Sequence, residues 1–159
     1  MDLEAFGQKS RSALPQAKKL SQRLRKMKPK VVDETFHTLH EAVFEQVDCL
    51  SCANCCKTTS PLFLRTDIER LARVFSMKPA EFIDAYLRLD EEGDYVLQHS
   101  PCPFLGADNH CLVYEERPKA CREYPHTNRK KMHGILNLTV KNTLICPAVH
   151  QIFKRLKRI

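Results

Sequence analysis

The sequence predicts a mainly α-helical protein with a small antiparallel β element, folded as one irregular domain. Apolar residues make up 43% of the 159 residues, and the chain has no tryptophan, only four glycines and many strong helix formers. Runs of Val and Ile alternating with helical patterns, which a parallel α/β sheet requires, are absent. Eight cysteines stand at short spacings, a pattern typical of metal ligands. We therefore expect cysteine-bound metal to staple the fold.

Two helices are predicted before the first cysteine. Residues 12–28 form an amphipathic helix that Pro29 ends. A second helix starts near Glu34 with Asp33 as its cap and leads into Cys49. The apolar residues of the two helices recur at helical spacing: Leu14, Ala17, Leu20, Leu24 and Met27 in the first, and Phe36, Leu39, Val43 and Val47 in the second.

The middle of the chain predicts two short helices and a hairpin. Thr66-Asp67-Ile68-Glu69 has the pattern of a capping box and opens one helix. Pro79 is the first residue of the other, which continues to Leu87. Residues 87–89 and 95–97 flank a turn at Gly93 and predict an antiparallel pair. We assign these elements to the core and give them no chemistry.

Three cysteines, Cys102, Cys111 and Cys121, are expected in a loop with few regular elements. After that loop, the apolar pattern of residues 135–140 predicts a strand. Cys146-Pro147 then begins a C-terminal helix.

The charge is concentrated at the two ends of the sequence. Residues 9–30 hold nine Lys and Arg and no acid, and the last six residues hold four more. We therefore divide the chain into a basic amphipathic arm, residues 1–30, and a cysteine-cluster domain, residues 31–159. The arm suits an anionic partner, either a nucleic acid, an acidic protein or a membrane surface, although it lacks aromatic residues for base stacking. Simple docking of this helix on the core is the alternative.

Neither a secretory signal nor a transmembrane segment is visible in the sequence, and we expect a cytoplasmic protein. The cytosol keeps thiols reduced, so the cysteines are expected to be ligands rather than disulfides. The first group is Cys49-x2-Cys52-x2-Cys55-Cys56, a spacing at which several sulfurs converge on one centre.

Adjacent Cys55 and Cys56 point in different directions and seldom fit one tetrahedron, which indicates two sites. One partition places Cys49, Cys52, Cys55 and Cys146 together and leaves Cys56, Cys102, Cys111 and Cys121 as the second set. Zinc and an iron–sulfur cluster both remain open, because thiolates accept both.

The residues around the cysteines carry a family resemblance. It rests on the following runs: Cys49-x2-Cys52-x2-Cys55-Cys56, Cys102-Pro103-Phe104-Leu105, Cys111-Leu112-Val113-Tyr114, Arg117-Pro118-x2-Cys121-Arg122-x-Tyr124-Pro125, and Cys146. Over residues 47–150 the chain resembles the YkgJ-type cysteine-cluster family, a zinc- or iron-chelating domain. The resemblance implies metal chelation through all eight cysteines. A flagellin lysine-methylating enzyme is similar in the same core, but this chain has no glycine-rich nucleotide loop.

Four side chains are predicted to support the metal from outside its ligands: Arg117, Arg122, Tyr124 and His126. Four thiolates around zinc leave a net negative charge that guanidinium groups would offset. The alternatives are pairing of the arginines with Glu115, Glu116 or Glu123 and simple packing of the tyrosine. Three functions are open: a metal-binding module with a redox or accessory role, a metal-dependent enzyme that modifies protein or RNA, and a zinc-stabilised nucleic-acid-associated protein.

Overall fold

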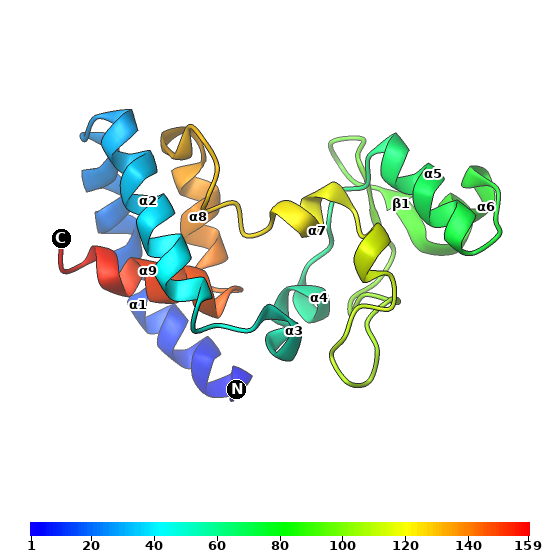
Figure 1. Cartoon of the computed structure of the whole chain (residues 1–159), viewed down its shortest axis with the longest axis horizontal. Helices are drawn as coiled ribbons and strands as arrows, with labels where there is room; N and C mark the ends of the chain where they lie inside the picture. The colour runs from blue at the N-terminus through cyan, green and yellow to red at the C-terminus, as the bar shows by residue number, and fades with distance from the viewer. The chain divides into compact units, whose positions relative to one another are not determined.

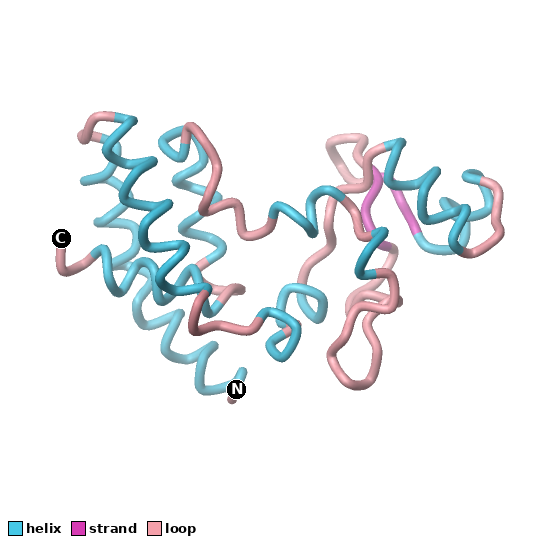
Figure 2. Tube along the Cα trace, viewed as in Figure 1, coloured by secondary structure: helices cyan, strands magenta, loops and turns pink.

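The computed structural model describes residues 1–159, which form two compact units. Unit 1 comprises Met1–Cys49 and Pro125–Ile159, and unit 2 comprises Leu50–Tyr124. The chain is 60% helical and has one small two-stranded antiparallel sheet (Figure 2), so the predicted fold class is confirmed. Each unit has its own secondary structure and is described separately.

Unit 1 is a helical bundle (Figure 1). Its elements are α1 (Leu3–Arg25), α2 (Pro29–Phe44), the 3-10 turn η2 (Met132–Ile135), α8 (Leu136–Asn142) and α9 (Pro147–Leu156). Helix α9 packs against α1 and α2, and α8 packs against α1. Phe36 of α2 and Phe153 of α9 meet edge to face, with ring centroids 6.2 Å apart, in the centre of this core. The predicted C-terminal helix after Cys146 is confirmed.

The first two helices differ from the prediction at their boundaries. Helix α1 begins at Leu3 rather than residue 12, because Asp2 caps it by accepting from the Glu4 and Ala5 backbone N–H groups. It ends at Arg25, and Pro29 opens α2 instead of ending α1, since a proline fits the first turn of a helix.

The predicted cap Asp33 lies inside α2. Its carboxylate accepts from the Lys131 and Met132 backbone N–H groups at 2.9 and 2.8 Å, so it fixes the segment before α8 rather than the start of a helix.

The strand predicted at residues 135–140 is wrong, because this segment forms α8. Leu136, Thr139 and Val140 are buried, whereas Leu138 is 45% exposed. That burial follows the period of a helix. Packing of α8 against α1 therefore decides the conformation of a segment whose apolar residues nearly alternate.

Unit 2 contains short elements joined by long loops (Figures 1 and 2). They are α3 (Cys49–Cys52, whose first residue belongs to unit 1), α4 (Asn54–Thr58), α5 (Arg65–Val74), α6 (Pro79–Tyr86), β1 (Leu87–Leu89), β2 (Tyr95–Leu97), the 3-10 turn η1 (Tyr114–Glu116) and α7 (Lys119–Glu123). The predicted hairpin is confirmed, with Leu87 opposite Leu97. Gly93 adopts φ +82° in its turn, a conformation that glycine tolerates best. The helix predicted from Pro79 is also confirmed.

Helix α5 starts two residues earlier than the predicted capping box. Leu64 is the N-cap, and the Asp67 carboxylate accepts from its backbone N–H at 2.8 Å, which is the role expected of Glu69. Behind α5 lies an aromatic core in which Phe104 stacks on Phe75 and Phe82, with centroids 5.3 and 6.0 Å apart. The irregular loop is thus held at Phe104 by the core of unit 2.

None of the helices combines the length and apolar character needed to cross a membrane.

Candidate metal centre

The eight cysteines are distributed over both units. Cys49 and Cys146 belong to unit 1, and the other six belong to unit 2. Their positions are as follows: Cys49 and Cys52 are the ends of α3, Cys55 and Cys56 lie in α4, Cys102 and Cys111 lie between β2 and η1, Cys121 lies in α7, and Cys146 is the N-cap of α9. Cys49 is exposed, Cys146 is buried, and the remaining six are half-buried.

The first cysteine group folds as two short helical turns rather than as one helix. Ala53 separates α3 from α4 and adopts φ +49°, the left-handed conformation. A non-glycine residue rarely does so without a structural reason. Within α4, Cys55 and Cys56 are neighbours, and successive helical residues point about 100° apart. The side chains of Cys55 and Cys56 therefore point in different directions.

Four thiols of unit 2 lie near enough to influence one another electrostatically. The charge of Cys56 affects the pKa of Cys102, Cys111 and Cys121, and the charges of Cys102 and Cys111 also affect the pKa of Cys121. The Cys102 backbone N–H donates to the Cys56 carbonyl at 2.8 Å and joins the loop directly to α4. These four cysteines are the second set of the predicted partition, and their grouping as ligands of one metal stays a prediction.

A backbone turn places two of these thiols. Leu105 and Cys111 form an isolated antiparallel bridge, and the Gly106 N–H donates to the His110 carbonyl at 2.8 Å. The Leu112 N–H donates to the Phe104 carbonyl at the same distance. Because Phe104 is anchored in the aromatic core, this turn fixes the backbone on which Cys102 and Cys111 stand.

The electrostatic environment of the four thiols is uneven. Burial raises the pKa of Cys121 to about 12, and the neighbouring thiols raise it further. Burial likewise raises the pKa of Cys102 to about 11 and increases the pKa of Cys111. A side-chain hydrogen bond from Cys55 lowers the pKa of Cys56 to about 7, against the effect of burial. Cys56 is therefore the thiol that ionises most readily among the four.

Backbone N–H groups point at the sulfurs of the loop cysteines. The Phe104 N–H donates to the Cys102 thiol, and the Val113 N–H donates to the Cys111 thiol. The Leu105 N–H donates to the Cys102 carbonyl at 3.1 Å and also lowers the pKa of the Cys102 thiol. Each of these hydrogen bonds favours the thiolate and opposes the effect of burial on the pKa. N–H donors two and three residues after a cysteine also stabilise the sulfur ligands of bound metals.

Arg117 supplies positive charge to the same region. Its guanidinium lies 3.8 Å from the centroid of the Tyr114 ring and donates to the Tyr114 carbonyl at 2.6 Å. From there it lowers the pKa of Cys111 and of Cys121, in each case against the larger effect of burial. Arg122 is exposed. Neither arginine forms an ion pair in residues 1–159, and Glu123 pairs with Lys119 at 3.7 Å.

The aromatic and histidine candidates are placed as follows. Tyr124 is the last residue of unit 2, and His126, with φ +64°, follows Pro125 in unit 1. Both are half-buried, and their predicted support of a metal stays a prediction. His110 is exposed, and its ring bonds the Asp108 carbonyl at 3.1 Å.

One supporting pair was missed by the sequence analysis. Asp67 of α5 is 1% exposed and accepts from the Arg70 guanidinium at 2.8 Å and from the Lys119 backbone N–H at 3.1 Å. Arg70 in turn donates to the Glu116 and Arg117 carbonyls at 3.1 and 3.0 Å. This pair, the Asp67–Arg70 clamp, fixes the start of the helix that carries Cys121. The sequence signal was present, because Asp67 and Arg70 stand three residues apart, but it indicated only a helix start.

The donor chemistry fits a metal that prefers sulfur. Thiolates are soft ligands that suit zinc and iron–sulfur clusters, and four of them complete a tetrahedral site. Within residues 1–159, no three Cys, His, Asp or Glu side chains stand at coordination geometry as they are. A metal held by the four thiols of unit 2 would require them to draw closer together; all four are half-buried and lie in α4, the irregular loop and α7.

The family comparison adds an independent observation. The family model that matches residues 48–146 is named for the motif of the first cysteine group and is described as "Putative zinc- or iron-chelating domain". The chain belongs to the CxxCxxCC family. The match covers more than half of the sequence. It includes all eight cysteines, from Cys49 near its start to Cys146 at its end. No curated protein and no solved structure matches this chain.

Proposed function

We propose that this CxxCxxCC protein is a metal-binding protein in which Cys56, Cys102, Cys111 and Cys121 form one complete four-thiolate site inside unit 2. The observation that carries the proposal is the 2.8 Å hydrogen bond from the Cys102 N–H to the Cys56 carbonyl, which joins the loop to α4. The effect of these thiols on one another's pKa supports the same grouping. Zinc or iron bound there would tie α4, the irregular loop and α7 together. The other predicted set, Cys49, Cys52, Cys55 and Cys146, stays a prediction.

The surroundings of the four thiols support the proposal. Burial opposes ionisation, whereas the N–H donors to Cys102 and Cys111 and the guanidinium of Arg117 favour it. A bound cation adds the remaining stabilisation of the thiolates, and their protons leave as it binds. Arg117 then offsets part of the negative charge of a four-thiolate centre. A reducing compartment such as the cytoplasm keeps such thiols available.

Zinc would give a structural centre, and an iron–sulfur cluster would give a redox centre. The full chain, purified without oxygen, distinguishes them by metal content and by the visible absorption of an iron–sulfur cluster. A redox or accessory role follows from a cluster, and a structural role follows from zinc.

The grouping is tested with Cys102→Ser, Cys121→Ser and the double variant, each compared with the unmodified full chain. If one site uses both residues, each single variant loses the metal of that site, and the double variant loses no more. Leu112→Ser is the matched control, because Leu112 is 71% exposed beside Cys111, and this variant should keep its full metal content.

Two results would contradict the grouping. Full metal content in either single cysteine variant would exclude that residue as an essential ligand. A double variant that loses the summed metal of the two single variants would place Cys102 and Cys121 in different sites.

A further inference from the structure

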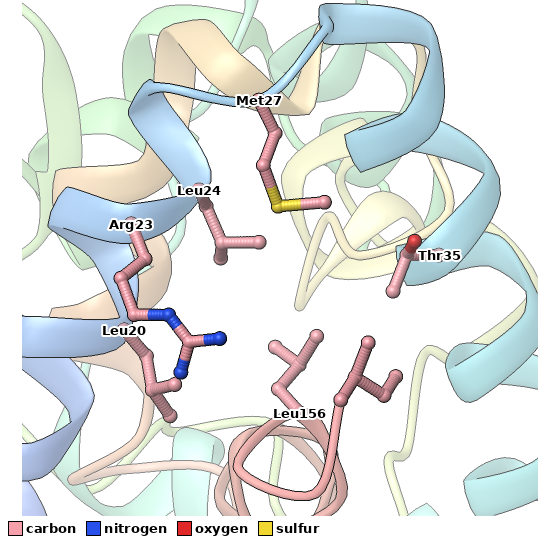
Figure 3. Close-up of a pocket in the computed structure, with 7 residues that line it drawn as sticks. Leu20, Arg23, Leu24, Met27, Thr35 and Leu156 are labelled. Carbon is pink, nitrogen blue, oxygen red and sulfur yellow. The ribbon is translucent and has the colours of Figure 1, made fainter.

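A small cavity lies in unit 1, and no cysteine lines it. It opens between the end of α1, the first half of α2 and the end of α9, and its volume is about 130 Å³ (Figure 3). The residues that line it are Leu20, Arg23, Leu24, Met27, Thr35, Leu156 and Ile159. Five of the seven are aliphatic or methionine side chains, so the cavity is suited to an apolar group.

Arg23 is the charged residue of this lining. Figure 3 shows its side chain extending from α1 toward the cavity, with Leu156 on the adjacent wall. No carboxylate in residues 1–159 pairs with Arg23. The hydroxyl of Thr35 is already used, because it donates to the Val31 carbonyl at 2.7 Å. The guanidinium is therefore the polar group left to meet a ligand, and it calls for an anion.

The helix ends around the cavity are also basic. Lys26 and Lys28 flank Met27, and Lys157 and Arg158 separate Leu156 from Ile159. Residues 9–30 contain no acid. Glu34 precedes the lining residue Thr35 in the sequence. Its carboxylate lies 3.9 Å from the Lys30 ammonium, which offsets its negative charge. The cavity is thus apolar inside, and the side chains at its rim are mainly basic.

The size of the cavity selects among anionic partners. An engineered cavity of about 150 Å³ holds one benzene molecule, so this one suits a single apolar side chain rather than a lipid tail. Base stacking needs aromatic platforms, and the lining contains no aromatic residue.

From this combination we propose that unit 1 binds an acidic segment of a partner protein. One aliphatic or aromatic side chain of that segment fills the cavity, and a neighbouring carboxylate pairs with Arg23. This interaction is separate from the proposed metal site, because all seven lining residues lie in unit 1 and none is a cysteine.

The test is fluorescence anisotropy of the full chain with a short labelled peptide of acidic residues that has one central phenylalanine. Replacing that phenylalanine by alanine in the peptide should weaken binding about tenfold, because the apolar contact is lost. Arg23→Glu should weaken binding of the phenylalanine peptide at least about fivefold, because a carboxylate then faces a carboxylate.

Lys18→Glu is the matched control, since Lys18 is an exposed cation of the same helix but does not line the cavity. It should change the affinity by less than about twofold. Equal losses in the two charge-reversal variants would mean diffuse attraction and would overturn the proposal. So would equal binding of the two peptides, absence of binding, or displacement of the peptide by single-stranded RNA at a lower concentration than by unlabelled peptide.

Discussion

Removing the carboxylate of Asp67 should destabilise unit 2 by about 3 kcal/mol, since a partly buried charged partner and two backbone donors lose their acceptor. Asp67 is 1% exposed and accepts from the Leu64 and Lys119 N–H groups and from Arg70. Arg70 is 27% exposed on its side chain, so water compensates it in part and keeps the loss well below that of a fully buried pair. Asp67→Ala in the full chain is the perturbation.

The assay is urea unfolding of the metal-free protein followed by circular dichroism, with hydrogen exchange of α5 and α7 to assign the loss to unit 2. Glu69→Ala is the matched control, because Glu69 lies in the same helix and pairs with Arg65, which is 92% exposed, at 2.9 Å. That exposed pair should contribute less than about 1 kcal/mol. Equal losses in the two variants, or unchanged exchange of α7 in Asp67→Ala, would refute the role assigned to the Asp67–Arg70 clamp.

Two further predictions concern the two cores. Phe104→Ala should lower the free energy of unfolding by about 3 to 5 kcal/mol, because Phe104 is buried in the aromatic core of unit 2. Leu112→Ala at an exposed position should change it by less than about 0.5 kcal/mol. Similar denaturant midpoints for the two variants would contradict the anchoring of the loop at Phe104. Burial lowers the pKa of His40, whose Nδ1 lies 2.8 Å from the hydroxyl oxygen of the fully buried Thr127. The unfolded chain therefore binds this proton more readily, and stability should fall as the pH drops below about 6.5. In urea unfolding between neutral and mildly acid pH, His40→Asn should make the free energy of unfolding less dependent on pH. His99→Asn is the control, because His99 is exposed. The same pH dependence in the two variants would exclude His40 as the cause of the loss of stability.

Much of the fold could be predicted because local signals agreed with tertiary packing. The hairpin around Gly93 and the helices that start at Pro79 and Pro147 each follow from a residue with a restricted or unusual backbone. Segment 135–140 failed because its apolar residues fit either period, and only the packing of α8 against α1 decides between them.

The type of ligand in the candidate site could be predicted from the sequence, but the long-range hydrogen bonds that hold the site's loop and helices in place could not. Cysteine spacing indicated metal and led to a grouping of Cys56 with Cys102, but the hydrogen bond that joins these two residues could not be predicted from any spacing rule. The Asp67–Arg70 clamp acts over a separation of about fifty residues, from Arg70 to Arg117. Sequence patterns report neighbours on one element, whereas such contacts depend on how loops return to a helix.

The division of the chain has a consequence for its biosynthesis. Unit 1 is discontinuous, because its two segments, Met1–Cys49 and Pro125–Ile159, are separated by the whole of unit 2. On the ribosome, chains emerge from the N-terminus, so α1 and α2 appear long before α9 can cover Val32, Phe36 and Val43. Unit 2 is complete once Tyr124 has emerged, and its four proposed ligands are then all present. Metal can thus reach unit 2 while the helical bundle of unit 1 still waits for its last helix.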